Sequence, residues 1–289
     1  MVVFPNAKIN LGLNVLRRRD DGYHDISTVF VPYKVLSDVL EVVFADEPGQ
    51  TAGPGTSPAK TTLTEYGLLT GCEPEKNLCF KAWRLMADKY GVPPVHIHLY
   101  KNIPSGSGLG GGSSDAAFTL RLLNDLCGLG LSDETLAAEA ATLGSDCAFF
   151  IYNRPMLASG RGEILRDCAL CLDGYRIEVV VPMSRETESD RAAVAEDNAP
   201  GAGRAGKPVH VSTAEAYRGV TPAIPAVPIE EILARPVEQW RGTLVNDFER
   251  HILPAHPEIA AAKQAFYDRG ALYASMSGSG SSVFGIFRA

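Results

Sequence analysis

The sequence has 289 residues, of which 45% are hydrophobic and 21% are charged, a composition typical of a soluble globular protein with room for one large or two small domains. No run approaches the roughly 20 apolar residues that cross a membrane, and the N-terminus enters a patterned strand without an export signal. The formal net charge of −7 argues against general nucleic-acid binding, which needs a basic surface. Six cysteines in a chain of this length do not suggest a disulfide framework, so we expect a reducing cytoplasm.

Residues 7–15 alternate apolar and polar side chains, a pattern that predicts a strand with one buried face and one polar face. Lys8 and Asn10 point the same way from the polar face. On the residues alone, Lys8 is also explained as a cation on a solvated strand surface. A turn then leads to Tyr23 and His24, an aromatic ring and an imidazole that together can stack on a base and hydrogen-bond its edge.

Residues 35–44 are predicted to form another strand, and residues 45–60, rich in Gly, Pro and Thr, an exposed loop. A helix is predicted over residues 77–90, where apolar side chains recur on one side. Asn77 stands at the N-cap position of that helix, which gives it a purely structural interpretation. The next predicted strand, residues 95–101, leads into a glycine-rich run.

That run, from Pro104 to Asp115, reads Pro-Ser-Gly-Ser-Gly-Leu-Gly-Gly-Gly-Ser-Ser-Asp, with five glycines and four hydroxyl side chains in twelve residues. Glycines let backbone amides approach an anion closely and adopt positive φ angles. Residues 116–126 are predicted to form a helix, which would direct its N-terminal amides and positive dipole end at that anion. A strand, a glycine loop and a helix in this order predict a site for the phosphates of a nucleotide.

Two common phosphate loops do not fit the run. Gly106, Gly108 and Gly111 form a G-x-G-x-x-G, but the acidic residue expected about 20 positions later in a dinucleotide-binding fold would fall near Asp125, inside the predicted helix. A Walker A loop ends in Gly-Lys-Ser/Thr, and this run has no lysine. A flexible glycine-serine linker is the structural alternative, which the apolar periodicity on both sides disfavours.

A further helix is predicted between Ser132, as its N-cap, and Gly144, which closes it. Asp146 follows in the sequence Gly-Ser-Asp-Cys-Ala, immediately before a short apolar segment. On the residues alone, Asp146 is equally well explained as an N-cap of that segment and as a carboxylate that takes part in a reaction.

The pattern changes near residue 158, where a glycine turn occupies residues 159–163. Residues 184–207 contain almost no large apolar side chain and cannot bury enough surface to offset the entropy of ordering, so we expect a mobile insertion. The remaining predictions are a strand over residues 176–181, helices over residues 244–253 and 257–269, and a strand, glycine turn and strand over residues 272–287.

Taken together, these segments resemble the GHMP kinases, the family of galactokinase, homoserine kinase and mevalonate kinase. The resemblance rests on the glycine run and covers nearly the whole chain. Four further motifs stand in the order expected of the family: Ala7-Lys-Ile-Asn-Leu11, Asp21-Gly-Tyr-His24, Gly144-Ser-Asp146 and Met276-Ser-Gly-Ser-Gly280. The resemblance implies an α+β fold of two subdomains, an ATP-binding domain over residues 1–157 and a C-terminal domain over residues 158–289, with the active site in the cleft between them.

The three glycines followed by Ser-Ser-Asp are similar to the motif in the family members that phosphorylate 4-diphosphocytidyl-2-C-methyl-D-erythritol. The resemblance implies a small-molecule kinase that uses ATP and Mg²⁺ to phosphorylate the 2-hydroxyl of this acceptor in isoprenoid synthesis, as a monomer or homodimer. Two alternatives remain, a kinase with another alcohol acceptor and a non-catalytic nucleotide-binding protein. The residues implied to bind ATP are Asn77, Lys101, Pro104, Ser105, Gly106, Ser107, Gly108, Leu109, Gly110, Gly111, Gly112, Ser113 and Ser114.

By the same resemblance, Asp146 is the general base, and Lys8 stabilises the developing alkoxide and keeps that carboxylate ionised. A loop hydroxyl, of Ser113 or Ser114, is a candidate ligand of Mg²⁺. The glycine turn at residues 277–282 resembles the third motif of the family, which closes over the phosphate loop. The residues implied to bind the acceptor are Asn10 at the erythritol hydroxyls, Tyr23, His24 and Tyr217 at the cytosine, and Asp146.

Overall fold

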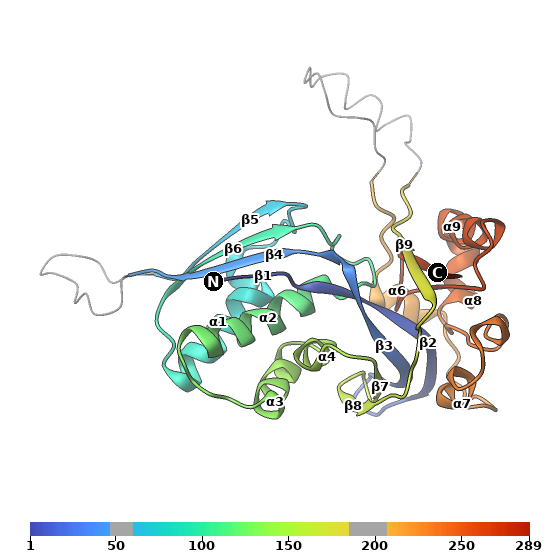
Figure 1. The fold of residues 1–289 in the computed structure, drawn as a ribbon, viewed down its shortest axis with the longest axis horizontal. Coiled ribbons are helices and arrows are strands. Elements are labelled where there is room, and N and C mark those ends of the chain that lie inside the picture. Colours follow the sequence, from blue (N-terminus) through green and yellow to red (C-terminus); the bar gives the residue numbers. More distant parts are fainter. Residues whose placement is uncertain (47–59, 185–206) are drawn as a thin grey trace, which may run out of the picture. The chain divides into compact units, whose positions relative to one another are not determined.

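The structure is a computed structural model that describes residues 1–46, 60–184 and 207–289. These residues form two compact units (Figure 1). Among the helices in these ranges, none is long and apolar enough to cross a membrane. Unit 1 comprises residues 1–9, 16–105 and 109–169, and unit 2 comprises residues 10–15, 106–108 and 170–289.

Four of the sequence-based expectations about organisation stay predictions. The boundary between residues 157 and 158 and the cleft between the two domains are not established by the contacts within either unit. The predicted insertion lies outside the described residues except for its ends, where the backbone N–H of Ser184 donates to the carbonyl of Lys207. Most of the exposed loop predicted over residues 45–60 also lies outside the described residues.

Unit 1 contains strands of two four-stranded sheets together with a layer of helices. One sheet has the strand order β1-β4-β6-β5, in which β5 runs parallel to β6 and the other pairs are antiparallel. The other has the order β2-β3-β7-β8. In chain order the elements are β1 (Val2–Val3), β2 (Asn6–Arg18), β3 (His24–Ser37), β4 (Val39–Phe44), β5 (Thr62–Gly67), η1 (Pro74–Lys76), α1 (Leu78–Tyr90), β6 (Val95–Lys101), α2 (Gly111–Leu126), α3 (Asp133–Leu143), α4 (Cys147–Tyr152), β7 (Met156–Ser159) and β8 (Ile164–Asp167).

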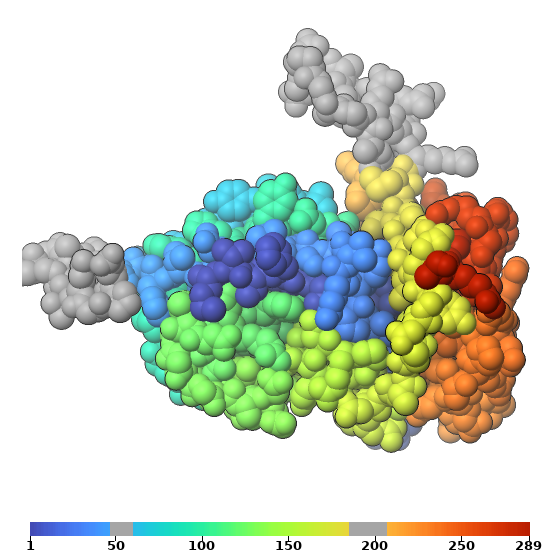
Figure 2. Space-filling model, in the orientation of Figure 1, coloured from blue at the N-terminus to red at the C-terminus, as the bar shows by residue number. Residues whose placement is uncertain are grey.

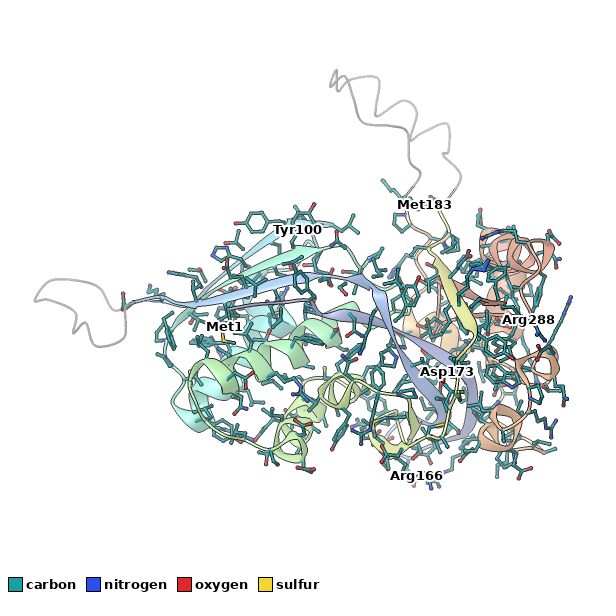
Figure 3. All side chains as sticks on the ribbon, viewed as in Figure 1. Met1, Tyr100, Arg166, Asp173, Met183 and Arg288 are labelled. Carbon is teal, nitrogen blue, oxygen red and sulfur yellow. The ribbon has the colours of Figure 1, made fainter. Side chains whose placement is uncertain are left out.

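The first sheet and the helices share one hydrophobic core. Along β6, the side chains of Val95, Ile97 and Leu99 are buried because they face the helical layer. Tyr100 alternates with them, points away from the core and is half exposed (Figure 3). At the surface, the dark blue N-terminal strand residues lie directly against the green residues of the helical layer (Figure 2). The shared core therefore joins this sheet to the helical layer.

Most predicted elements of this unit are confirmed, and two differ in an informative way. The strand predicted over residues 35–44 is divided at Asp38, which is fully buried between β3 and β4. The helix predicted from residue 116 begins instead at Gly111, so the last five residues of the glycine run are helical. The N-terminal amides of α2 therefore lie within the run itself, not after it.

The polar face predicted for the strand over residues 7–15 is not solvated. Each of the residues Lys8, Asn10 and Asn14 is no more than 5% exposed. Both faces of this part of β2 are thus covered, because other elements pack on the polar side as well. The interpretation of Lys8 as a cation on an open strand surface is therefore wrong.

Unit 2 is built on an antiparallel sheet of strand order β10-β11-β9. The middle stretch of β2, residues 10–15, belongs to this unit, where Leu13 exchanges backbone hydrogen bonds with Val245 and Asp247. This pairing holds the residues before Glu249 out of a helix, so the helix predicted from residue 244 begins later. The elements are β9 (Tyr175–Val180), α6 (Thr213–Arg218), α7 (Ile229–Leu233), η2 (Val237–Gln239), α8 (Glu249–Ala255), α9 (Pro257–Asp268), β10 (Tyr273–Met276) and β11 (Val283–Arg288).

Candidate active site

Lys8 and Asp146, far apart in sequence, form an ion pair in unit 1. The Nζ atom of Lys8 lies 3.3 Å from Oδ2 of Asp146, and it lies 5.1 Å from the ring centroid of Phe30. The lysine side chain is only 4% exposed, whereas that of the aspartate is 30% exposed. The pair therefore combines a buried cation with a carboxylate that a solute can reach.

The N-cap alternative for Asp146 does not describe its side chain. The residue stands at the N-cap position of α4, but its side chain makes no cap hydrogen bond. The backbone before the helix instead aims the carboxylate at Lys8. The residues on either side tie this turn to α2, because the hydroxyl of Ser113 hydrogen-bonds the thiol of Cys147 and lies 3.8 Å from where a Cβ on Gly144 would stand. Burial raises the pKa of the Cys147 thiol to about 12, so the thiol stays neutral.

The start of α2 lies beside the same ion pair. Gly110 precedes the helix with φ of 72°, and a Cβ there would lie 3.1 Å from side-chain carbons of Lys8 and 3.0 Å from the ring of Phe150. The backbone N–H of Lys8 donates to the carbonyl of Leu109 at 2.9 Å. A glycine at this position thus lets the lysine approach the helix terminus, where free amides favour an anion.

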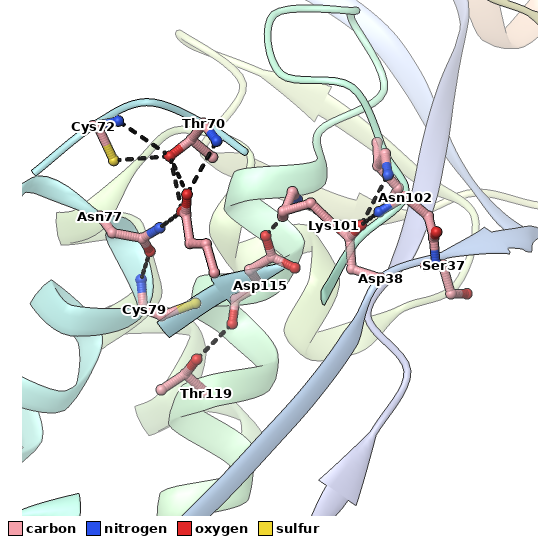
Figure 4. A network of polar contacts seen from close by, with 12 residues as sticks. Ser37, Asp38, Thr70, Cys72, Asn77, Cys79, Lys101, Asn102, Asp115 and Thr119 are labelled. Atoms are coloured by element: carbon pink, nitrogen blue, oxygen red, sulfur yellow. Dashed lines mark hydrogen bonds and ion pairs between the residues drawn. The ribbon is translucent and has the colours of Figure 1, made fainter. Parts of the chain in front are cut away.

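Lys101 occupies a buried ionic cluster beneath the glycine run (Figure 4). Its Nζ donates to the carboxylates of Asp38 and Asp115, at 2.6 Å to the latter, and all three side chains are at most 3% exposed. The other oxygen of Asp38 accepts from the backbone N–H groups of Asn102 and Ile103. The cluster therefore ties the end of β6 to the first turn of α2, and the Lys101 ammonium itself is enclosed.

Burial has the largest single effect on the pKa of Asp115 and on that of Lys101. It raises the pKa of Asp115 to about 8, against the opposing attraction of the Lys101 ammonium. The pKa of Lys101 is raised despite its burial, because both carboxylates favour its charged form. One oxygen of Asp115, together with the hydroxyl of Ser114, has no hydrogen-bond partner among the described residues.

Asn77 is the N-cap of α1, as its structural interpretation predicted. Its Oδ1 accepts from the backbone N–H of Cys79 at 2.8 Å, and its Nδ2 donates to Glu65 at 2.7 Å (Figure 4). The same glutamate also accepts from the hydroxyl of Thr70. Both ends of the Asn77 amide are therefore engaged in joining β5 to α1, and its implied contact with ATP stays a prediction.

In unit 2, residues 106–108 lie against the C-terminal glycine turn. A Cβ on Gly108, whose φ is 79°, would stand 2.1 Å from the carbonyl oxygen of Ser277, so no other residue fits there without a shift. The hydroxyl of Ser277 donates to the carbonyl of Gly108 at 2.9 Å, and the backbone N–H of Asn10 donates to that hydroxyl at 3.3 Å. The glycine turn thus fixes this part of the run and the position of Asn10.

The two residues implied to hold cytosine lie at the start of β3 in unit 1. Tyr23 is 57% exposed, and the guanidinium carbon of Arg161 lies 5.0 Å from its ring centroid. His24 is half-buried, and burial, followed by the charge of Arg18, lowers its pKa. Tyr217, the implied second ring, lies on α6 in unit 2 and packs edge-on against Phe248. Sequence analysis assigned no role to Arg161, although its glycine turn at residues 159–163 was visible.

The chain matches known proteins over its full length. Residues 77–154 match the family model of the GHMP kinases N terminal domain, and residues 231–289 match that of the GHMP kinases C terminal. The chain is 45% identical to 4-diphosphocytidyl-2-C-methyl-D-erythritol kinase from Parabacteroides distasonis over 287 residues, covering 99% of this chain and 92% of the relative. It is 41% identical to the protein of the same name from Porphyromonas gingivalis, covering 100% of this chain and 92% of the relative.

Solved structures give the same result. A crystal structure of 4-(cytidine 5'-diphospho)-2C-methyl-D-erythritol kinase matches with a TM-score of 0.70 and 33% identity, covering 99% of this chain and 89% of the other. A homoserine kinase from Cytophaga hutchinsonii, at 18% identity and a TM-score of 0.60 over 98% of this chain and 85% of the other, shares the fold. The chain therefore belongs to the 4-diphosphocytidyl-2-C-methyl-D-erythritol kinases within the GHMP kinase family, whose members are ATP-dependent small-molecule phosphotransferases.

Proposed function

We propose that this chain transfers the γ-phosphoryl group of ATP to the 2-hydroxyl of 4-diphosphocytidyl-2-C-methyl-D-erythritol, giving the 2-phosphate and ADP in the non-mevalonate isoprenoid pathway. The names of its full-length relatives support the choice of acceptor. The observation that carries the proposed chemistry is the pair formed by Lys8 and Asp146 beside the start of α2. The six free cysteines suit the reducing cytoplasm that we propose as its location.

In the proposed reaction, Asp146 accepts the proton of the acceptor hydroxyl as that oxygen attacks the γ-phosphorus. Lys8, buried and 3.3 Å away, pairs with the carboxylate in the ground state and stabilises the alkoxide that develops in the transition state. The bond from the γ-phosphorus to the bridging oxygen breaks, and ADP leaves with that oxygen. The backbone amides at the start of α2 are placed to stabilise charge on the transferred group.

Mg²⁺, when bound, would neutralise charge on the donor phosphates. Of the two candidate hydroxyls, that of Ser114 lies in a fully buried residue, whereas Ser113 is half-buried and contacts Cys147 next to Asp146. Ser113 is therefore the residue that we propose to face the metal. The described residues contain no group of three or more acidic, His or Cys side chains that could hold a metal ion, so we propose that the ion relies mainly on the nucleotide's own oxygens.

A coupled assay of ADP release, run with a panel of acceptors, tests the proposal. We expect turnover with 4-diphosphocytidyl-2-C-methyl-D-erythritol and none above background with homoserine or mevalonate, and we expect ADP release to depend on added Mg²⁺. Phosphorylation of a simple alcohol at a higher kcat/KM than the cytidylyl acceptor would replace the proposed function with that of another kinase in the family. ATP binding without turnover of any acceptor would favour the non-catalytic alternative.

A further inference from the structure

The turn between β7 and β8 places an arginine next to two residues of the proposed acceptor site. Its backbone is held in place, because the N–H of Ile26 donates to the carbonyl of Gly160 at 2.7 Å and the N–H of Arg161 donates to the carboxylate of Glu163 at 2.6 Å. A Cβ on Gly162 would stand 3.7 Å from Oδ1 of Asp146. The turn therefore passes directly beside the carboxylate that we propose as the base.

The side chain of Arg161 extends from this turn over the face of Tyr23, with the guanidinium carbon 5.0 Å from the ring centroid. It is 38% exposed, and its Nε lies 3.8 Å from a carboxylate oxygen of Glu163, a distance too long for a hydrogen bond. To the residues that the structure describes, this guanidinium donates no hydrogen bond. Its donors are therefore available to a ligand, while the ring below restrains the plane of the group.

The charges nearby make such a cation useful to an acceptor that carries a diphosphate. Asp146 and Asp21 lie close to the same turn, and they would repel an anionic ligand. Asp21 is already paired with Arg19, at 3.0 Å. Lys8 already offsets the charge of Asp146. Arg161 adds a cation on the side of Tyr23, where it can offset the repulsion of a diphosphate.

We propose that Arg161 binds the diphosphate of the acceptor and so determines specificity for a nucleoside diphosphate ester. This inference rests on the proposed function, in which the acceptor joins a cytosine at Tyr23 to a hydroxyl at Asp146. The diphosphate lies between these two ends of the acceptor. Arg161 contacts the tyrosine directly and is one residue from Gly162, which lies beside the aspartate. A guanidinium is suited to two parallel hydrogen bonds with phosphate oxygens.

Calorimetric titration of cytidine and of CDP into the intact protein and three variants tests the proposal. The wild type is expected to bind CDP more tightly than cytidine. In R161Q the affinity for CDP should fall by about 10-fold, while that for cytidine changes little, because cytidine lacks the phosphates that the guanidinium is proposed to contact. R161K should retain part of the preference for CDP, since it keeps the charge but not the two-pronged geometry.

R154Q is the matched control, because Arg154 also stacks on an aromatic ring, that of Tyr152, and pairs with an acidic residue, Asp167. Its affinity for CDP should match that of the wild type. In steady-state assays R161Q should raise the KM for the acceptor about 10-fold and leave the KM for ATP unchanged.

Each outcome of these titrations shows which part of the proposal is wrong. Equal losses for cytidine and CDP in R161Q would show that the arginine only supports the ring of Tyr23, and unchanged affinities would show that it does not contact the ligand. Either result overturns the inference and leaves the proposed function standing. If the wild type binds neither CDP nor cytidine, the proposed acceptor is itself wrong, and the inference fails with it.

Discussion

Two lysines of unit 1 each face aspartate side chains, and the two sites differ in their access to solvent. Lys8 pairs with one carboxylate, that of Asp146, whose side chain is 30% exposed. Lys101 contacts two carboxylates, those of Asp38 and Asp115, and none of these three side chains is more than 3% exposed. The same two residue types therefore build one open pair and one closed cluster at the two sides of the glycine run.

Access to solvent decides what each site can do. In the closed cluster, burial raises the pKa of Asp115 to about 8, so its charged form is disfavoured there. These groups are enclosed, and their contacts fix the backbone at the end of β6, while the implied contact of Lys101 with ATP stays a prediction. In the open pair, the exposed part of Asp146 is available to accept a proton from a ligand. Chemistry is thus expected at the first site and structural support at the second.

Substitution of Asp146 by Asn should have the largest effect on catalysis. It keeps the shape of the side chain but removes the base, so kcat is expected to fall by about 10²–10⁴-fold. ATP affinity should change little, because the start of α2 is unaltered. Steady-state rates and calorimetric titration of ATP provide the measurement. Turnover within a few-fold of the wild type would show that Asp146 is not the base.

Replacing Lys101 by Met should have the largest effect on stability. It leaves the buried side chains of Asp38 and Asp115 without their cation, and removal of one partner from a buried ion pair costs about 3–5 kcal/mol. Urea unfolding measures the loss, with K8M as the matched variant. K8M should lose clearly less free energy of unfolding, because the exposed part of Asp146 regains water, yet it should lose most of its turnover. Equal losses of stability in the two variants would contradict the distinction between the two sites.

The dependence of the free energy of unfolding on pH should reveal the raised pKa of Asp115. The pKa of an Asp in the unfolded chain is near 4 and rises to about 8 in the folded protein, so between these values the folded state binds more protons. Stability from this group is therefore lost as pH rises from 4 to 8. Unfolding midpoints at pH 5, 6, 7 and 8 should fall less steeply in D115N than in the wild type. Parallel curves would assign the pH dependence to other groups.

Substitution of His24 by Ala should have the smallest effect of these variants. The loss of one hydrogen bond to the cytosine is expected to weaken acceptor binding by about 3- to 10-fold. Binding of ATP should stay unchanged, since His24 lies at the start of β3 and not on the glycine run. Calorimetry with the acceptor and with ATP measures both affinities. An unchanged affinity for the acceptor would remove the assignment of His24 to the cytosine.

Local patterns in the sequence predicted the elements whose structure depends on local interactions. The alternation over residues 95–101 gave β6 with its observed bounds, and Ser132 caps α3 as predicted. The start of α2 was placed too late, because Gly111 and Gly112 have a weak helix propensity; the close approach of Gly111 to Ile103 and Lys101 is a contact that the local sequence does not reveal.

Local patterns in the sequence could not predict the contacts between segments that are distant in the chain. Motif resemblance selected Lys8 and Asp146, but their pairing joins β2 to the turn before α4, a contact between distant segments. The enclosure of Lys101 depends on Asp38, which stands at a break between two strands that read as one in the sequence. Arg161 was missed because an arginine in a glycine turn has no distinctive pattern, and its position over Tyr23 is visible only in the folded chain.

The anchorage of the glycine run to β2 has a consequence for how this enzyme could diverge. Leu109 is held by the main-chain N–H of residue 8, a group that every amino acid except proline possesses. A mutation that replaces the lysine side chain therefore removes the cation and spares the tether. If the proposed roles hold, we expect loss of phosphoryl transfer to be separable from loss of nucleotide binding in such a scaffold. A gene copy released from selection for turnover could thus persist as a nucleotide sensor after a single codon change.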